Sequence, residues 1–221
     1  MKLFKKKCRF ERSLAILSEK GFTEEYAASL KAELAEAERE QDIAKGKSFL
    51  ANAQLILGNI TDAYQTFEEI DLKKLEPRLQ GNLFSNMVFA DFVRDNFKRA
   101  EELYRSRNAE ILGEHSDASK RSLAIHEHIK GRYEAAVEIL VNMMDSECRF
   151  LDICRVKSML RLDMYEKAAD FSAFFSRYNG CGELTAEVNK LRNKIVSGLP
   201  PKRKAELVAR LFLPLLRNMR A

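Results

Sequence analysis

The stretch GRYEAAVEIL, residues 131–140, contains the pattern that decides the fold, because the same arrangement of residues occurs four times in the chain. In each copy a turn-forming residue is followed two positions later by an aromatic residue or Ile, and five positions later by Ala. The other copies are GNITDAYQTF (58–67), DNFKRAEELY (95–104) and DMYEKAADFS (163–172). The four copies start 37, 36 and 32 residues apart, a spacing typical of helical repeats.

Each copy predicts the turn of a helix hairpin. Gly readily adopts the left-handed backbone conformation that ends a helix, and Asp tolerates it. The Ala then lies one turn inside the second helix, where its small side chain allows the two helices to approach closely. Apolar spacing predicts first helices at 44–57, 80–94, 117–130 and 149–162, and second helices at 60–74, 97–112, 133–146 and 165–178.

The pattern resembles the second half of the tetratricopeptide repeat (TPR), and the resemblance covers about residues 44–178. The first helices depart from the family's Trp-Leu-Gly signature; the first copy, for example, has Lys47, Leu50 and Ala51 there. The resemblance implies an all-α fold, a right-handed α-solenoid of antiparallel helix hairpins, with four repeats over residues 43–180.

Helical caps are expected at both ends of this solenoid. Residues 1–42 are predicted to form a basic N-terminus followed by a capping hairpin with helices at 9–19 and 23–40. Thr23 is expected to cap the second of these helices, and Glu33 is expected to face solvent. Residues 181–221 are predicted to form a capping helix at 183–197 and a basic amphipathic helix.

The charge is distributed unevenly along the 221 residues, whose formal net charge is +5. Six bases and one acid occupy residues 1–12, and nine bases and one acid occupy residues 190–221, so the middle of the chain is acidic. A dedicated nucleic-acid-binding protein carries an evenly basic surface, and we therefore expect no nucleic-acid partner.

No arrangement of residues in the sequence predicts catalysis or a cofactor. His126 and His128 point in different directions on a helix and cannot share a metal ion. The four cysteines form no zinc pattern and are typical of reduced thiols in a cytoplasmic protein. Phosphate-binding and metalloprotease motifs are absent from the sequence, as are apolar runs long enough to span a membrane. We expect a protein that is not an enzyme and needs no cofactor.

The resemblance to TPR proteins implies that the first helices line a concave groove that binds a peptide or a helix of a partner protein. Asn52 and Asn86 match two positions of the carboxylate clamp of that family, but bases are missing from the other clamp positions. Phe89 and Val93 would form an apolar pocket in this groove. The candidate partner-binding residues are Lys45, Asn52, Asn82, Asn86, Phe89, Val93, Arg121, Ile125, His128, Lys157 and Arg161.

The C-terminal segment predicts an amphipathic helix with basic flanks. Its apolar stripe includes Leu207, Leu211, Phe212, Leu215 and Leu216. Such a helix can dock on its own chain, join two copies in a homodimer, or lie on an anionic membrane surface. Two functions therefore stay open: a protein-protein interaction scaffold with an unidentified protein or peptide partner, and a peripheral membrane-surface adaptor anchored by its basic ends.

Overall fold

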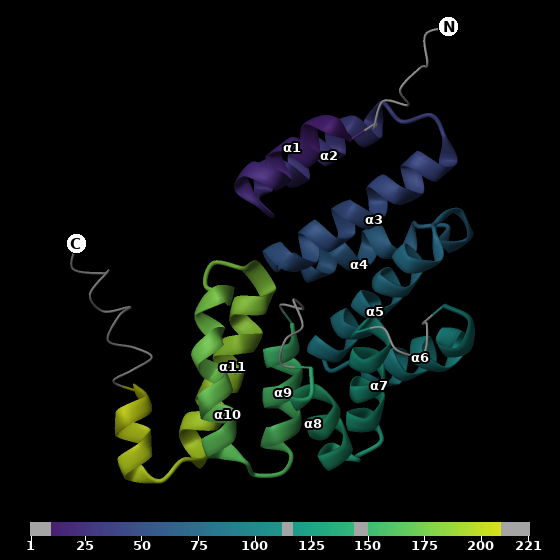
Figure 1. The fold of residues 1–221 in the computed structure, drawn as a ribbon. Coiled ribbons are helices and arrows are strands. Elements are labelled where there is room, and N and C mark those ends of the chain that lie inside the picture. The colour runs from purple at the N-terminus through teal and green to yellow at the C-terminus, as the bar shows by residue number, and fades with distance from the viewer. Residues whose placement is uncertain (1–9, 112–116, 144–149, 209–221) are drawn as a thin grey trace, which may run out of the picture.

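The computed structural model describes residues 10–111, 117–143 and 150–208, and the regular secondary structure within these ranges is helical (Figure 1). The helices are α1 (Glu11–Lys20), α2 (Glu24–Ala35), α3 (Glu40–Leu57), α4 (Ile60–Glu68), α5 (Pro77–Val93), α6 (Phe97–Ile111), α7 (Asp117–Ile129), α8 (Tyr133–Val141), α9 (Leu151–Leu160), α10 (Tyr165–Ser172) and α11 (Gly182–Gly198). Two short 3₁₀ helices, η1 (Leu72–Lys74) and η2 (Ala173–Tyr178), follow α4 and α10. Residues 201–208 are also helical.

The four predicted hairpins are confirmed as α3–α4, α5–α6, α7–α8 and α9–α10. Each predicted turn residue has positive φ: 85° at Gly58, 58° at Asp95, 76° at Gly131 and 53° at Asp163. In all four turns the next residue donates its N–H to the carbonyl five positions earlier, at 2.8–3.0 Å. This bond belongs to the Schellman motif, which satisfies a carbonyl that the helix leaves without a partner. The hairpins pack into an all-α solenoid-like stack.

The four repeat alanines occupy equivalent buried positions. Ala63, Ala100, Ala136 and Ala168 are all 0% exposed. Since no solvent reaches any of the four methyl groups, the repeat register predicted from the sequence is confirmed. A larger side chain at these positions would force the two helices of a hairpin apart.

Some second helices end earlier than apolar spacing predicts. The first, expected at 60–74, ends at Glu68. The side chain of Asp71 then accepts a hydrogen bond from the N–H of Lys73 at 3.0 Å and starts η1. Asp side chains compete in this way with the hydrogen bonds of a helix. Ile70 and Leu75 on either side of η1 are buried and keep this segment against the core.

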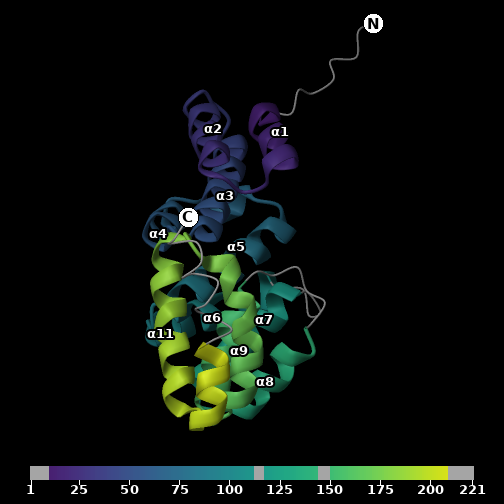
Figure 2. The same cartoon turned by 90° about the vertical axis from the view of Figure 1, so that its left-hand side faces the viewer.

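The N-terminal hairpin α1–α2 packs against α3 at one end of the molecule (Figures 1 and 2). Thr23 caps α2 as predicted, accepting from the N–H of Tyr26 at 3.2 Å. A separate small core holds the hairpin in place. Its buried members are Phe10, Tyr26, Ala27, Leu30, Leu50 and Ala53, the last two from α3.

The expectation that Glu33 faces solvent is wrong. Glu33 is 7% exposed, and its carboxylate accepts hydrogen bonds from the backbone N–H groups of Arg12 at 3.2 Å and Ser13 at 3.1 Å. The hydroxyl of Ser13 donates to the same carboxylate. A carboxylate at the first turn of α1 satisfies N–H groups that have no partner within the helix and interacts favourably with the helix dipole.

The C-terminal helix α11 contacts the first repeat as well as the last. Its Glu183 donates its N–H to the carbonyl of Gly58 at 2.8 Å, and the carboxylate of Glu183 accepts the N–H of Thr61 at 2.8 Å. Gly58 has no room for a side chain, because a Cβ there would lie 1.8 Å from the carbonyl oxygen of Cys181. The two ends of the four-repeat stack are therefore joined through α11.

Candidate functional site

The predicted groove residues divide into an exposed group and a buried group. Asn82 and Arg161 are exposed, and Lys45, Asn52 and Asn86 are partly exposed. The other six are buried, with exposed fractions of 0–8%: Phe89, Val93, Arg121, Ile125, His128 and Lys157. Helices α3 and α5 are therefore open at these exposed positions, whereas the predicted residues on α7 are all covered by other parts of the chain.

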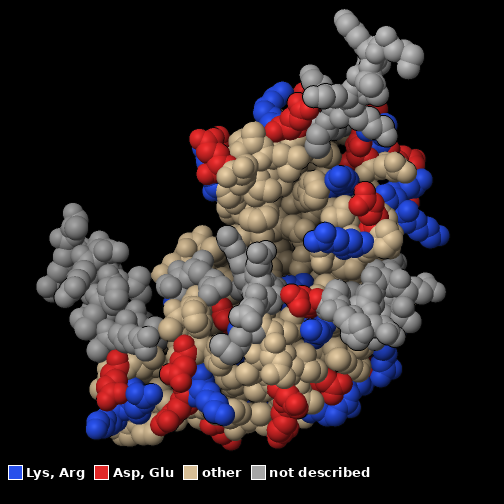
Figure 3. All heavy atoms as spheres, viewed as in Figure 1, with Lys and Arg blue, Asp and Glu red and all other residues tan. Residues whose placement is uncertain are grey.

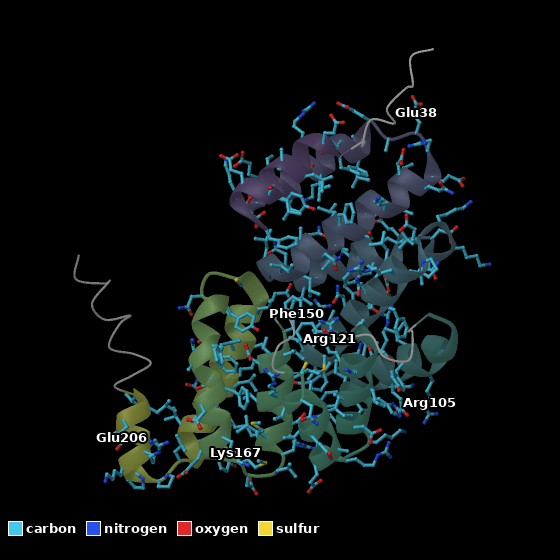
Figure 4. All side chains as sticks on the ribbon, in the orientation of Figure 1. Glu38, Arg105, Arg121, Phe150, Lys167 and Glu206 are labelled. Carbon is cyan, nitrogen blue, oxygen red and sulfur yellow. The ribbon has the colours of Figure 1, made fainter. Side chains whose placement is uncertain are left out.

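Phe89 and Val93 do not form an open apolar pocket. Phe89 is 0% exposed, and its ring stacks on the ring of Phe150 with 4.4 Å between centroids. Figure 4 shows Phe150 and Arg121 in the interior of the stack, whereas the labelled Glu38, Arg105, Lys167 and Glu206 lie at its outside. A side chain of the same chain thus occupies the place that the prediction assigned to a partner.

Lys157 stabilises the contact between α9 and the end of α5. Its Nζ donates to the carbonyls of Phe92 at 3.1 Å and Val93 at 3.0 Å, the last two residues of α5. The same atom forms ion pairs with Asp95 at 2.9 Å and Glu187 of α11 at 3.0 Å. A cation at a helix C-terminus satisfies unpaired carbonyls and the negative end of the helix dipole. The ammonium group of Lys157 is therefore engaged by α5, by Asp95 and by α11 of the same chain.

His126 and His128 contact different parts of the chain, as the helical spacing predicts. His126 stacks on Tyr104 at 4.3 Å, while His128 lies edge-on to Phe92 at 4.9 Å and its Nδ1 is 2.9 Å from the hydroxyl of Ser158. Burial, together with the positive charges of Arg161 and Lys157, lowers the pKa of His128 to about 4. His128 is thus a neutral residue of the core at physiological pH.

A row of polar side chains connects the first helices of three repeats. Asn86 on α5 donates through Nδ2 to Oδ1 of Asn52 on α3 at 2.5 Å. Arg121 on α7 donates to Oδ1 of Asn86 at 2.5 Å and to the hydroxyl of Ser85 at 2.7 and 2.9 Å. We call Asn52, Asn86 and Arg121 the polar ladder. These bonds fix the orientation of both amides, so that each presents a defined donor or acceptor.

The exposed positions next to the polar ladder form what we call the open strip: Lys45, Asn52, Arg78, Asn82 and Asn86. Arg78 is exposed and was missed in the sequence. It precedes Asn82 by four residues on α5, a spacing that places both side chains on the same face and could have identified it. Lys45 lies with its Nζ 5.8 Å from the ring centroid of Phe49. The open strip therefore combines amides with two cations.

Arg161, the remaining predicted residue, lies at the C-terminal end of α9. Its guanidinium donates to the hydroxyl of Tyr133 at 2.9 and 3.1 Å and stacks over that ring at 5.2 Å. The contact joins α9 to α8, and Arg161 does not extend the open strip.

One buried carboxyl group has an unusual environment outside the open strip. Asp91 on α5 is 1% exposed, and burial raises its pKa to about 6. Its Oδ1 accepts from Asn96 at 3.1 Å, while its Oδ2 and the hydroxyl of Tyr64 have no hydrogen-bond partner within the described residues. Burial also raises the pKa of Tyr64 to about 12. The pair is a local weak point of the core.

The described residues contain neither a cluster of metal ligands nor a membrane-spanning helix. Within residues 10–111, 117–143 and 150–208, no three His, Cys, Asp or Glu side chains come together as metal ligands. In the same ranges no helix has the length and apolar composition needed to cross a membrane. The membrane or oligomer contacts predicted at Leu211, Phe212, Leu215 and Leu216 lie outside the described residues.

The sequence matches no protein-family model and no curated protein. Among solved structures, a tetratricopeptide repeat protein from Parabacteroides merdae ATCC 43184 is similar at a TM-score of 0.38 and 15% identity, over 93% of this chain and 90% of that chain. The four equivalent turns and alanines of this chain define it independently as an α-helical repeat protein.

Proposed function

We propose that this chain is a protein-interaction scaffold without catalytic activity, and that a polypeptide partner binds on the open strip. The proposal rests chiefly on the polar ladder, in which the buried Arg121 of α7 orients Asn86 and Asn86 in turn orients Asn52, so that α5 and α3 each carry a partly exposed, oriented amide. Neutral amides both donate and accept hydrogen bonds, as peptide groups do. A surface of this kind suits the main chain of a partner segment.

Buried side chains narrow the part of the groove that a partner can use. Phe89 and Lys157 are engaged within the chain, so the surface available for a partner is confined to Lys45, Asn52, Arg78, Asn82 and Asn86. The solenoid-like stack supplies rigidity, because each amide sits on a helix rather than on a loop. Rigid presentation reduces the ordering cost of binding.

Site-specific crosslinking tests this function. A photoreactive amino acid at Asn82, on the open strip, is expected to capture one defined partner, which mass spectrometry identifies. The matched control is the same amino acid at Lys98, an exposed position on α6. Asn52→Ala with Asn86→Ala should reduce capture at position 82 with unchanged circular dichroism. Equal capture at both positions would contradict the proposal.

The membrane adaptor stays an alternative prediction. Lys202, Arg203 and Lys204 are exposed, as an interfacial helix requires, but Leu207 of the predicted apolar stripe packs against the core of its own chain. The described part of this helix thus supports docking on the chain itself. Co-sedimentation of the full chain with phosphatidylserine vesicles tests the alternative, which requires binding that weakens as salt is raised.

A further inference from the structure

We infer that Arg121 is a positioning residue that sets the specificity of the open strip. It acts through Asn86 to turn the Nδ2 group of Asn52 outward, so that this part of the strip recognises a hydrogen-bond acceptor of the polypeptide partner and rejects a donor. This inference rests on the proposed function and adds to it the polarity of the group that is recognised.

The direction of the polar ladder is set by the guanidinium of Arg121, which can donate hydrogen bonds but cannot accept them. Its Nε and Nη2 donate to the hydroxyl of Ser85 at 2.9 and 2.7 Å. That hydroxyl donates its own proton to the carbonyl of Ala118 at 3.0 Å and therefore faces Arg121 with its lone pairs. Arg121 and Ser85 are both buried, and Figure 4 shows Arg121 in the interior of the stack. The guanidinium is thus held in place by the protein itself.

The amide of Asn86 must then present its oxygen to Arg121. Nη2 of Arg121 donates to Oδ1 of Asn86 at 2.5 Å, and the reverse orientation would place amide protons against guanidinium protons. With Oδ1 held on this side, the Nδ2 group of Asn86 lies on the other side and donates to Oδ1 of Asn52 at 2.5 Å. Because bonds donated by a charged group are stronger than those between neutral groups, the buried guanidinium decides the orientation of the amide.

Asn52 is the last member of the ladder and presents a donor to solvent. Its Oδ1 faces Asn86, so its Nδ2 points away from the ladder. Nδ2 of Asn52 has no hydrogen-bond partner within the described residues and is not among their buried unpaired polar atoms, and the side chain is partly exposed. A partner carbonyl placed there gains a hydrogen bond. A partner N–H would meet a second donor and lose the bond that it makes to water.

The charge of the surrounding surface offers no comparable selectivity. On the face that Figure 3 shows, basic and acidic side chains are mixed over the N-terminal end of the molecule. A surface of mixed charge attracts neither acids nor bases as a class. The direction of the hydrogen-bonding groups is therefore the property by which this part of the strip discriminates. Arg121 controls that direction without touching the partner, because its own side chain is buried.

Asn86→Asp should reverse this polarity while keeping Arg121 in place. An ionised carboxylate only accepts hydrogen bonds, so one of its oxygens pairs with Arg121 and the other faces Asn52, which must turn its Nδ2 inward. The variant gains an ion pair with the guanidinium and should be at least as stable as the wild type in a thermal melt. Asn193→Asp, at an exposed position on α11, has the same change in charge and is the matched control.

NMR of the full chain without any partner measures the orientation. In the wild type the side-chain amide protons should exchange with water slowly at Asn86 and rapidly at Asn52. The Asn52 protons should become slow in Asn86→Asp and stay rapid in Asn193→Asp. Arg121→Lys, whose side chain also only donates, should keep the wild-type pattern, and Arg121→Gln, whose side chain donates and accepts, should lose it. An unchanged exchange rate at Asn52 in Asn86→Asp would overturn the inference, even if the Arg121 variants do not fold.

Capture by the photoreactive amino acid at position 82 then tests the selectivity. Asn86→Asp should reduce capture about tenfold, because an acceptor of the partner loses its donor. Asn52→Asp should have the same effect, since it still accepts from Asn86 but presents an oxygen outward, whereas Asn193→Asp should leave capture unchanged. Equal capture by wild type and Asn86→Asp would overturn the inference and leave the proposed function intact. Absence of capture by the wild type would refute the proposed function, and the selectivity with it, whatever the NMR pattern.

Discussion

Replacing Asp91 with Asn should stabilise the protein at neutral pH. Asp91 is 1% exposed near the C-terminal end of α5, where the helix dipole also disfavours a negative charge. Asn keeps the carbonyl oxygen that accepts from Asn96. The substitution therefore removes a buried charge and keeps this hydrogen bond.

The pKa of Asp91 gives the magnitude and the pH range. Burial raises it from 3.8 to about 6, although Arg99 and Arg94 act in the opposite direction. The folded state therefore binds a proton more tightly than the unfolded state. The contribution of Asp91 to the free energy of unfolding is most favourable below pH 3.8, falls as the pH rises to about 6, and is constant above. A shift of about two units corresponds to about 3 kcal/mol, the upper limit of the gain expected from Asn.

Urea unfolding of wild type and Asp91→Asn at pH 7.5 and at the lowest pH where both fold provides the measurement. At pH 7.5 the variant should be more stable by about 1–3 kcal/mol, which raises the melting temperature of a chain of this size by several degrees. This advantage should shrink towards acidic pH as Asp91 takes up its proton. Asp170→Asn on the exposed side of α10 is the control and should change stability little at either pH. The reasoning would be refuted if Asp91→Asn were less stable than the wild type at pH 7.5. It would also be refuted if the gain in the free energy of unfolding were the same at both pH values.

Four further changes test the fold. Ala136→Leu should overpack the α7–α8 hairpin and cost about 1–3 kcal/mol in urea unfolding; an unchanged melt would contradict the repeat register. Glu33→Ala should cost about 1–3 kcal/mol by leaving two N–H groups of α1 unsatisfied, with faster hydrogen exchange in α1 as its specific signature. Lys157→Met should cost about 3–5 kcal/mol because Glu187 then loses its buried partner, and Lys157→Met with Glu187→Leu should recover part of it. Deletion of residues 200–221 should lower the melting temperature without lipid; an unaffected melt together with salt-sensitive vesicle binding by the full chain would favour the membrane adaptor.

Local sequence was sufficient to predict the hairpins because the determinants of a turn lie within a few residues. Gly58 and Gly131 can take positive φ at little cost, and Asp95 and Asp163 accept it in the same place. The residue five positions later must be small because the two helices of the same hairpin approach each other closely there. The pattern therefore predicted all four turns and the burial of all four alanines.

Positions that depend on distant parts of the chain could not be predicted in this way. Glu33 follows helical spacing on α2 as a solvent-facing residue would, yet its partners are N–H groups 20 and 21 residues earlier. Phe89 was predicted to face the groove from α5, but its ring is buried against Phe150. Helical periodicity specifies the direction of a side chain on its own helix and carries no information about which helix approaches it.

Lys157 shows why contacts with distant parts of the chain matter when a binding surface is predicted from sequence. In the predicted groove a lysine on the fourth first helix would be solvated and could contact a partner. In the structure its ammonium group instead donates a hydrogen bond to the carbonyl of Val93 at the C-terminal end of α5, 64 residues earlier in the chain. It also forms an ion pair with Glu187 of α11. Lysines of two first helices thus have different environments, because Lys157 is buried against α5 and α11 whereas Lys45 is partly exposed. Substitutions at Lys157 should therefore lower stability, whereas binding at the proposed open strip should respond to substitutions at Asn52 and Asn86 on α3 and α5.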